Sequence, residues 1–423
     1  MAADRLKVIV NDRCLRNVRT GVGHYVAELL AALPAVDPAL DVKPFYQRLR
    51  RGRFVRRAIE SHARGPAPSG PYEPPPDGRG SDVGRGPAIR RGSDVGGAHV
   101  DQGGSGGRLR RPPAALRRWM QAVYELAFEA FGPFGGCRLY HEPNHIPGPW
   151  QGPIVTTVHD LSVLRHPEWH PADRVAWYER DFLAALPRSE HFIAVSAFTR
   201  QEMIDLLDLA PERISVIHLG VRGVFQPRPR EQTAGWLARR GLPARYLLFA
   251  GTLEPRKNVE GLLSAYARLP GRLRERFPLL LAGAGGWGDD RLDGLTARMG
   301  LSGQVRRLGY VTDEELAWLY AGAAALVWPT LYEGFGLPPL ECLASGTPVI
   351  TSRRASLPEV VGEAGLLVDP RDPAEIASAI ERVIEDVDFA QALTRRGLMR
   401  AKEFSWLRCA EHHAAIYRRF ADA

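Results

Sequence analysis

Cysteine and long apolar runs are both scarce in this chain of 423 residues. The four cysteines are scattered without the spacing of a metal site, and they suggest free thiols in a reducing compartment. No apolar run reaches the roughly 18–20 residues that a membrane-spanning helix needs, and residues 1–4 do not resemble a signal peptide. We therefore expect a cytoplasmic protein, with peripheral contact at the inner membrane face left open.

Lysine is scarce too, because it occupies four positions among 56 basic residues. The formal net charge of +8 favours anionic partners such as nucleotide diphosphates and lipid head groups, although arginine content also follows genome composition. An Asp-x-Asp pair, which would hold a divalent cation, is absent from the predicted strand ends. We therefore expect no metal and no other cofactor.

The length and composition of the chain predict two domains of the α/β class. A chain of 423 residues is too long for one ordinary core and suits two domains of about 150–200 residues. The hydrophobic fraction of 45% and the charged fraction of 25% are typical of globular proteins. Short apolar runs followed by helical patterns indicate parallel strands connected by helices.

Residues 329–350 contain the most informative pattern, PTLYEGFGLPPLECLASGTPVI. They follow an apolar run that predicts a buried strand, and they place Glu333 beside two glycines. Pro338 and Pro339 then open a helical pattern that carries Glu341. A strand, a glycine-rich loop and a helix N-terminus together form a natural anion site, although a plain βαβ unit would also explain the pattern.

The glutamate pair within EGFGLPPLE, followed by SGTPVI, resembles the signature of the group 1 family of retaining glycosyltransferases. The resemblance implies a GT-B fold, in which two Rossmann-like domains face each other across a cleft and a C-terminal helix crosses back to the first domain. It places the acceptor domain at residues 1–225, the nucleotide-sugar domain at 226–403 and the crossing helix at 404–423.

The first domain begins with a predicted strand over residues 6–10, a loop that contains Gly21 and Gly23, and a helix over 24–33 that we expect to end at Pro34. The loop lacks the third glycine of a dinucleotide fingerprint. The resemblance implies that Gly21 and Gly23 approach the donor phosphates and the acceptor. A simple tight turn is the alternative.

Residues 50–113 are rich in Gly, Pro, Ser and Arg, and the segment GSDVG occurs in them twice, twelve residues apart. This composition predicts a disordered insertion. Its basic residues, from 48 to 57, could contact anionic lipid or nucleic acid, or form a solvated tail. A helix predicted over residues 116–131 could rest on a membrane, as in this family, or face the core.

A strand predicted over residues 154–158 ends at His159 and Asp160. A neutral imidazole there can accept or donate a hydrogen bond to a sugar hydroxyl, whereas many such histidines are structural. The resemblance implies that His159 contacts the transferred sugar and that Asp160 orients it or binds the acceptor. With Glu333 these form the predicted catalytic set, and His141 and Asn144 are weaker acceptor-side candidates.

The second domain opens with a strand predicted over residues 246–250, followed by Gly251 and the pair Arg256-Lys257. Arg presents a fork and Lys a point charge to phosphate oxygens, and the resemblance implies that the pair binds the donor's diphosphate. Many family members also place an Arg after this glycine, where Thr252 stands here. The predicted donor-binding residues are Gly21, Gly23, Gly251, Arg256, Lys257, Gly334, Phe335, Gly336, Leu337 and Glu341.

The resemblance implies a retaining hexosyltransferase. The blocks VHDLS and GTLEPRKN are similar to those of bacterial enzymes that carry mannose from GDP-mannose to a lipid-linked saccharide of a surface polysaccharide. Glu333 would bind the sugar or stabilise an oxocarbenium-like transition state, either as a covalent nucleophile or with attack on the leaving-group face. Glu341 would accept hydrogen bonds from the ribose.

Three other functions stay open at this point. The first is transfer from a UDP- or ADP-hexose. The second is a GT-B nucleotide-sugar epimerase that transfers nothing. The third is nucleic-acid binding by the arginine-rich insertion, although we do not expect nucleic acid as a partner.

Overall fold

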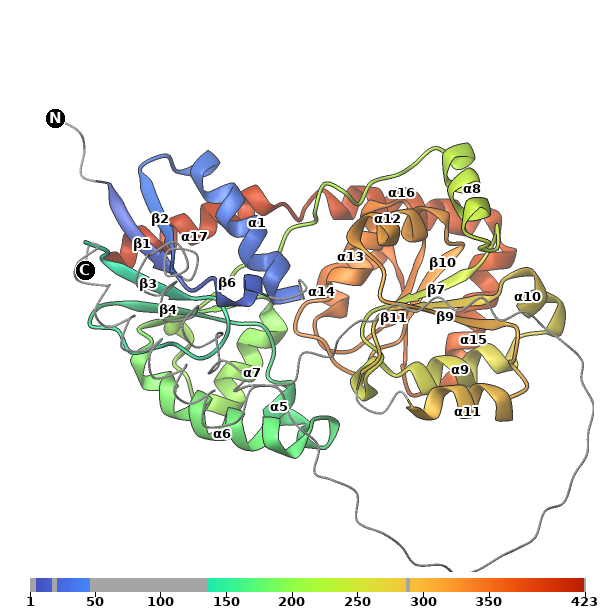
Figure 1. Ribbon diagram of the computed structural model, residues 1–423, viewed down its shortest axis with the longest axis horizontal. Helices are drawn as coiled ribbons and strands as arrows, with labels where there is room; N and C mark the ends of the chain where they lie inside the picture. Colours follow the sequence, from blue (N-terminus) through green and yellow to red (C-terminus); the bar gives the residue numbers. More distant parts are fainter. Residues whose placement is uncertain (1–4, 17–20, 46–135, 287–289, 422–423) are drawn as a thin grey trace, which may run out of the picture. The chain divides into compact units, whose positions relative to one another are not determined.

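The computed structural model describes residues 5–16, 21–45, 136–286 and 290–421. They form two parallel six-stranded sheets (Figure 1). The first sheet has the strand order β2-β1-β3-β4-β5-β6 and the second has the order β12-β11-β10-β7-β8-β9. The prediction of an α/β fold with two parallel sheets is therefore confirmed.

The strands are short and mostly buried on both faces, as expected for parallel sheets that helices cover. The strands of the first sheet are β1 (Leu6–Val10), β2 (Leu40–Pro44), β3 (Leu139–Glu142), β4 (Ile154–Val158), β5 (His191–Ala194) and β6 (Ile214–Val216). Those of the second are β7 (Leu247–Ala250), β8 (Leu279–Ala282), β9 (Val305–Gly309), β10 (Ala325–Trp328), β11 (Val349–Ser352) and β12 (Leu366–Val368). Every residue of β4, β7, β8 and β10 is buried, which explains the continuous apolar runs of β7, β8 and β10.

Helices cover both faces of each sheet (Figure 1). Those between the strands of the first sheet are α1 (Gly21–Val36), α5 (Ser162–Arg165), α6 (Ala172–Ala185) and α7 (Ala197–Leu207). Those of the second half are α8 (Arg230–Arg239), α9 (Val259–Arg268), α10 (Gly271–Arg276), α11 (Asp290–Arg298), α12 (Asp313–Gly322), α13 (Leu337–Ala344), α14 (Leu357–Val361), α15 (Pro373–Glu385) and α16 (Val387–Ala401). The chain ends with α17 (Trp406–Ala421).

The prediction for α1 was wrong at both ends. The helix begins at Gly21, so Gly21 and Gly23 lie in its first turn and not in a preceding loop. It also passes through Pro34 and ends at Val36. A proline near the end of a helix removes one backbone hydrogen bond, and the ladder resumes where the Asp37 N–H donates to the Leu33 carbonyl at 3.0 Å.

The last helix, α17, packs on the first sheet, as the predicted crossing helix should. Its buried His413 lies 2.7 Å from the Tyr25 hydroxyl of α1 through Nε2. Tyr417 donates at 2.7 Å to Nδ1 of His141 on β3. Arg418 forms two hydrogen bonds, of 2.7 and 2.6 Å, with the Asp37 carboxylate. These contacts tie residues that are more than 270 positions apart in sequence.

His141 is part of this packing and not a free acceptor-side group. Besides its bond to Tyr417, its Nε2 lies 2.8 Å from the Thr157 hydroxyl of β4. Burial, and the neighbouring histidines after it, hold the pKa of His141 well below its usual value, so the ring is neutral. The predicted insertion (50–113), its basic cluster (48–57) and the predicted helix (116–131) lie outside the described residues.

Candidate active site

The loop between β10 and α13 is held by hydroxyl groups that bind its backbone carbonyls. Ser356 Oγ donates to the carbonyls of Glu333 at 2.9 Å and Phe335 at 2.7 Å. Ser196 Oγ donates to the Gly334 carbonyl at 2.6 Å, and Thr199 Oγ1 donates to it at 3.1 Å. Three successive carbonyls are thus fixed, which orients the Glu333 side chain without using its carboxylate.

Gly334 brings this loop against the carboxyl end of β4. A Cβ atom built on Gly334 would lie 1.7 Å from the carbonyl oxygen of His159 and 2.9 Å from the Cβ of Asp160. Only glycine allows so close a backbone approach. The three predicted catalytic residues are therefore neighbours, although Glu333 is more than 170 residues from His159 and Asp160 in the sequence.

Glu333 is 7% exposed and holds both predicted phosphate-binding cations. Its Oε1 lies 3.0 Å from a terminal guanidinium nitrogen of Arg256 and accepts a hydrogen bond from Lys257. The Lys257 ammonium also lies 4.6 Å from the centre of the Trp328 ring. The Glu333 carboxylate therefore occupies both cations. A negatively charged ligand that bound Arg256 and Lys257 would compete with Glu333 for them.

The pKa values of the two buried cations, Arg256 and Lys257, shift in opposite directions. Burial, with Arg256 beside it, lowers the pKa of Lys257 despite the nearby carboxylates. Burial would also lower the pKa of Arg256, but the carboxylates of Glu333 and Glu254 outweigh it and raise that pKa. The Arg256 Nε lies 2.6 Å from the Glu254 carboxylate. Arg256 therefore stays charged, whereas the positive charge of Lys257 depends on stabilisation by the neighbouring carboxylates.

The turn that carries the cations is anchored by Asn258. This residue adopts a left-handed conformation, with φ of 56°, that Asn tolerates better than most residues. Its side-chain amide donates to the carbonyls of Pro329 at 3.0 Å and Pro370 at 2.6 Å. The sequence block PRKN thus places Arg256 and Lys257 in a short 3₁₀ helix (Pro255–Lys257) that is fixed to the loop after β10.

His159 has one ring nitrogen committed to the backbone. Its Nε2–H donates to the Pro143 carbonyl at 2.8 Å, which leaves Nδ1 as the acceptor nitrogen. Burial lowers the pKa of His159, although the Pro143 carbonyl opposes this, so the ring is neutral near pH 7. A neutral imidazole with an acceptor nitrogen is suited to bind a hydroxyl group.

Asp160 is ionised over a wide pH range. Burial would raise its pKa, but Arg256 and two hydrogen bonds from Ser162 outweigh burial and hold the pKa below its usual value. The bonds come from the Ser162 N–H at 3.0 Å and from its hydroxyl at 2.7 Å. Asp160 therefore adds a permanent negative charge next to Arg256.

The N-terminus of α13 offers fewer donors than the sequence suggests. Pro338 and Pro339 have no N–H, and the Leu340 N–H already reaches the Gly336 carbonyl at 3.4 Å. In the first turn the N–H groups of Gly336 and Leu337 remain as candidates. Gly336 has φ of 111°, a conformation that favours glycine, and it starts the helix.

Glu341 binds Arg222, which sequence reasoning missed. Glu341 lies on α13 and is 5% exposed, and its Oε1 accepts a hydrogen bond of 2.9 Å from Arg222. Burial raises the pKa of Glu341 to about 7, although Arg222 opposes this rise. Arg222 lies between β6 and α8, outside every motif that the sequence analysis identified.

The other predicted donor-binding residues lie in or near the same elements. A Cβ atom on Gly21 would lie 4.0 Å from Leu337 Cδ1, so the start of α1 is next to the start of α13. Gly251 follows β7 with φ of 138°. Phe335 is 5% exposed and packs on Phe404. Gly23 is buried in α1. Whether each contacts a donor stays a prediction.

Sequence reasoning also missed the hydroxyl and carboxyl groups that brace the site. Ser196 caps α7 by accepting a 3.0 Å bond from the Thr199 N–H, and its hydroxyl also donates to the Gly334 carbonyl. Tyr332 accepts from the Leu161 N–H at 3.1 Å and donates to Glu202. These are long-range contacts, which leave no local pattern.

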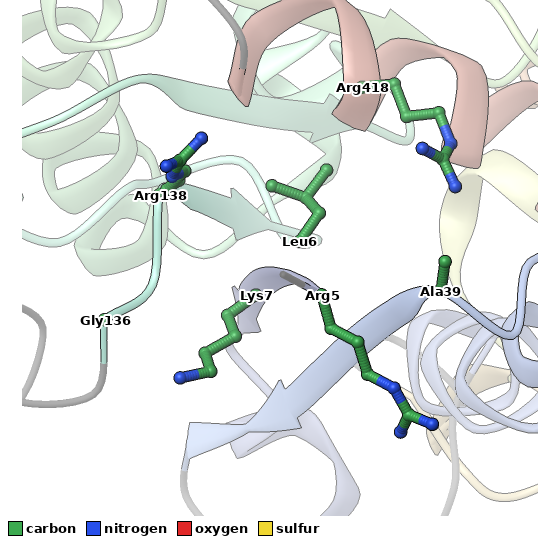
Figure 2. A pocket seen from close by; sticks show the side chains of 7 residues that line it. All are labelled: Arg5, Leu6, Lys7, Ala39, Gly136, Arg138 and Arg418. Atoms are coloured by element: carbon green, nitrogen blue, oxygen red, sulfur yellow. The ribbon is translucent and has the colours of Figure 1, made fainter. Parts of the chain in front are cut away.

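A basic cavity of 210 Å³ lies elsewhere, at the amino-terminal ends of β1 and β3 (Figure 2). Figure 2 shows its basic side chains diverging and not converging on one point. His159 and Asp160 lie at the opposite, carboxyl end of the same sheet. The cavity is therefore separate from the candidate active site. Its lining residues are Arg5, Leu6, Lys7, Ala39, Gly136, Arg138 and Arg418.

The described part of the chain contains no group of three or more His, Cys, Asp or Glu residues that could hold a metal ion. Among the same residues, no helix is both long and apolar enough to cross a membrane.

Comparison with known proteins gives consistent results. The chain matches the family model of glycosyl transferases group 1 over residues 239–399, and that of glycosyltransferase family 4 over residues 19–222. It is 42% identical over 282 residues to O-antigen chain mannosyltransferase B of Escherichia coli, which covers 66% of this chain and 74% of that protein.

Two further proteins extend the comparison. The chain is 33% identical over 273 residues to the serotype-specific mannosyltransferase WbdA of Escherichia coli, a match that covers 63% of this chain and 33% of WbdA. Its structure superimposes on that of WaaG, a glycosyltransferase involved in lipopolysaccharide biosynthesis, with a TM-score of 0.63, 14% identity and coverage of 97% and 99% of the two chains. The predicted GT-B fold is thus confirmed.

Proposed function

Since the chain belongs to the group 1 family of glycosyltransferases, we propose that this hexosyltransferase moves mannose from GDP-mannose, with retention of configuration, to a lipid-linked oligosaccharide or polysaccharide. The observation that carries the proposal is the 42% identity to O-antigen chain mannosyltransferase B. That relative's name supports both the sugar and a surface polysaccharide as the product. A lipid-linked acceptor would bring the enzyme to an anionic membrane surface as a peripheral protein.

The geometry supports a role for each charged group. Arg256 and Lys257 would hold the diphosphate, whose negative charge grows as the glycosidic bond breaks. They are now bound to Glu333, so the arriving diphosphate would share them with that carboxylate. Glu333 is then left beside the sugar, where it binds a hydroxyl or stabilises positive charge at the anomeric carbon. His159 Nδ1 would accept from a second hydroxyl.

The rival donors are UDP- and ADP-hexoses. The segment that we expect to contact the base, Tyr310 and Val311, follows β9, and the Tyr310 side chain is 60% exposed. Neither side chain is specific for one base, so the choice of GDP rests on the mannosyltransferase relatives.

The proposal is tested by a transfer assay with a synthetic lipid-linked oligosaccharide that ends in mannose. Incubation with GDP-mannose should extend the acceptor, and proton NMR of the product should show an α-linked mannose, as retention requires. A β-linked product would exclude retention. Isomerisation of the free nucleotide sugar, without transfer, would favour the epimerase alternative.

Transfer should continue in excess chelator. We propose that the two cations and the N-terminus of α13 do the work that a divalent metal does in other transferases. Turnover measured with and without EDTA should be equal. An enzyme that loses activity in EDTA and regains it with Mg²⁺ or Mn²⁺ would contradict this part of the scheme.

Replacing Lys257 by Met should weaken donor binding. Loss of one charged contact to a phosphate should raise the Kd for the donor by about tenfold or more. Calorimetric titration measures it, and the same substitution at the exposed Lys402 is the control. An unchanged Kd would show that Lys257 does not bind the diphosphate.

A further inference from the structure

Arg222 contacts three helices, α1, α12 and α13, through one buried guanidinium group. It lies between β6 and α8 and is 8% exposed. One terminal nitrogen donates to Glu341 Oε1 at 2.9 Å. The other donates to the Asp313 carboxylate at 2.7 Å and lies 2.9 Å from Nδ1 of His24 on α1. Its guanidinium carbon also stands 4.7 Å from the centre of the Phe225 ring.

The bond to Glu341 engages one side of the carboxylate. The bond from Arg222 reaches Oε1, and a carboxylate accepts hydrogen bonds on both oxygens. A carboxylate held through one oxygen by a fixed cation has its other oxygen oriented in a defined direction. Such an oxygen is suited to accept from the hydroxyl groups of a bound ribose.

Arg222 also opposes the protonation of Glu341. Burial raises the pKa of Glu341 to about 7, and Asp313 acts in the same direction, while Arg222 is the main opposing group. Tyr320 of α12 and the adjacent Cys342 also face Glu341, and His24 faces Arg222 and Asp313. Since Tyr320 and Cys342 are neutral near pH 7, removing Arg222 leaves a buried acid whose pKa rises further.

We propose that Arg222 is a positioning residue for the donor: it fixes the orientation of the Glu341 carboxylate toward the nucleotide's ribose and opposes its protonation. The inference rests on the proposed role of Glu341 in donor binding. It adds a residue that lies outside the EGFGLPPLE pattern and in the segment between the two sheets.

The test is the pH dependence of nucleotide binding. The Kd values of GDP, UDP and ADP are measured by calorimetry from pH 6 to pH 9 for the wild type and for Arg222→Met. A carboxylate accepts hydrogen bonds from hydroxyl groups more strongly than the neutral acid does, so affinity falls as the pH drops below the pKa. In the variant this fall begins at a higher pH. At pH 7 the variant should bind more weakly, by up to about tenfold for each unit by which the pKa rises. Near pH 9 the difference should shrink to the part that comes from the lost orientation of the carboxylate.

Three controls separate this role from a purely structural one. Arg228→Met removes a linker arginine that packs on Trp318 at 3.9 Å, and its pH profile should match that of the wild type. Arg222→Lys retains the positive charge and should shift the profile less than Arg222→Met does. In a Glu341→Gln background, Arg222→Met should add no pH dependence, because the group through which it acts is gone.

The outcomes are distinct. If the wild type binds UDP or ADP instead of GDP, the proposed donor is wrong. The pH dependence of the Kd of Arg222→Met is then compared with that of the wild type for the nucleotide that binds. A variant that is weaker by one constant factor at every pH, or one that matches the wild type at pH 7, would overturn the inference. Binding of none of the three nucleotides by the wild type would overturn both.

Discussion

Glu333→Gln is expected to abolish sugar transfer while nucleotide binding stays intact or becomes tighter. The amide keeps the volume of the side chain but cannot stabilise positive charge at the anomeric carbon. Losing one electrostatic group of this kind typically costs a factor of about 10²–10³ in turnover. Steady-state turnover and the Kd for GDP would be measured on the same preparation.

The expected affinity of Glu333→Gln for GDP follows from the ion pairs of Glu333. In the wild type, Arg256 at 3.0 Å and Lys257 are both engaged by Glu333. A neutral side chain releases these two cations for the diphosphate, so the Kd for GDP should not rise. Unchanged turnover would exclude the assigned role of Glu333. A large loss of GDP affinity would instead show that Glu333 serves mainly to hold the cations in place.

Gly334→Ala should reduce turnover by about two orders of magnitude or more and also destabilise the fold. The added Cβ would lie 1.7 Å from the His159 carbonyl oxygen, so the backbone must move. Movement would break the hydroxyl bonds from Ser196 and Thr199 to the Gly334 carbonyl. Strain of this kind and loss of buried hydrogen bonds each cost about 1–3 kcal/mol.

The control for this variant is Gly271→Ala. Gly271 has ordinary backbone angles and no atom within 4 Å of the position of an added Cβ. It should keep wild-type turnover and melting temperature. Full activity of Gly334→Ala would show that the close approach of the loop to β4 is not needed for catalysis.

The sequence predicted the parts of the site that are local. The buried strand β10, the glycine loop and the prolines that open α13 are contiguous, and each has a physical signature of its own. The same is true of β4, which ends next to His159, and of the block PRKN. A family pattern placed these three stretches in one site, and the backbone contact at Gly334 explains how two of them meet.

The missed features are contacts between distant segments. Arg222 and Glu341 are 119 residues apart, and nothing near Arg222 in the sequence indicates a buried ion pair. Ser356 likewise binds two carbonyls of the loop from beyond β11. The start of α1 was misplaced for a local reason, since glycines in a first helical turn resemble a loop.

Calorimetric titration of the wild-type protein with GDP-mannose, UDP-glucose, UDP-N-acetylglucosamine and ADP-glucose tests the central claim most directly. The proposed function predicts that GDP-mannose binds selectively. Selective binding of one of the UDP or ADP sugars would contradict the assignment of mannose, while the fold and the charged site would stand.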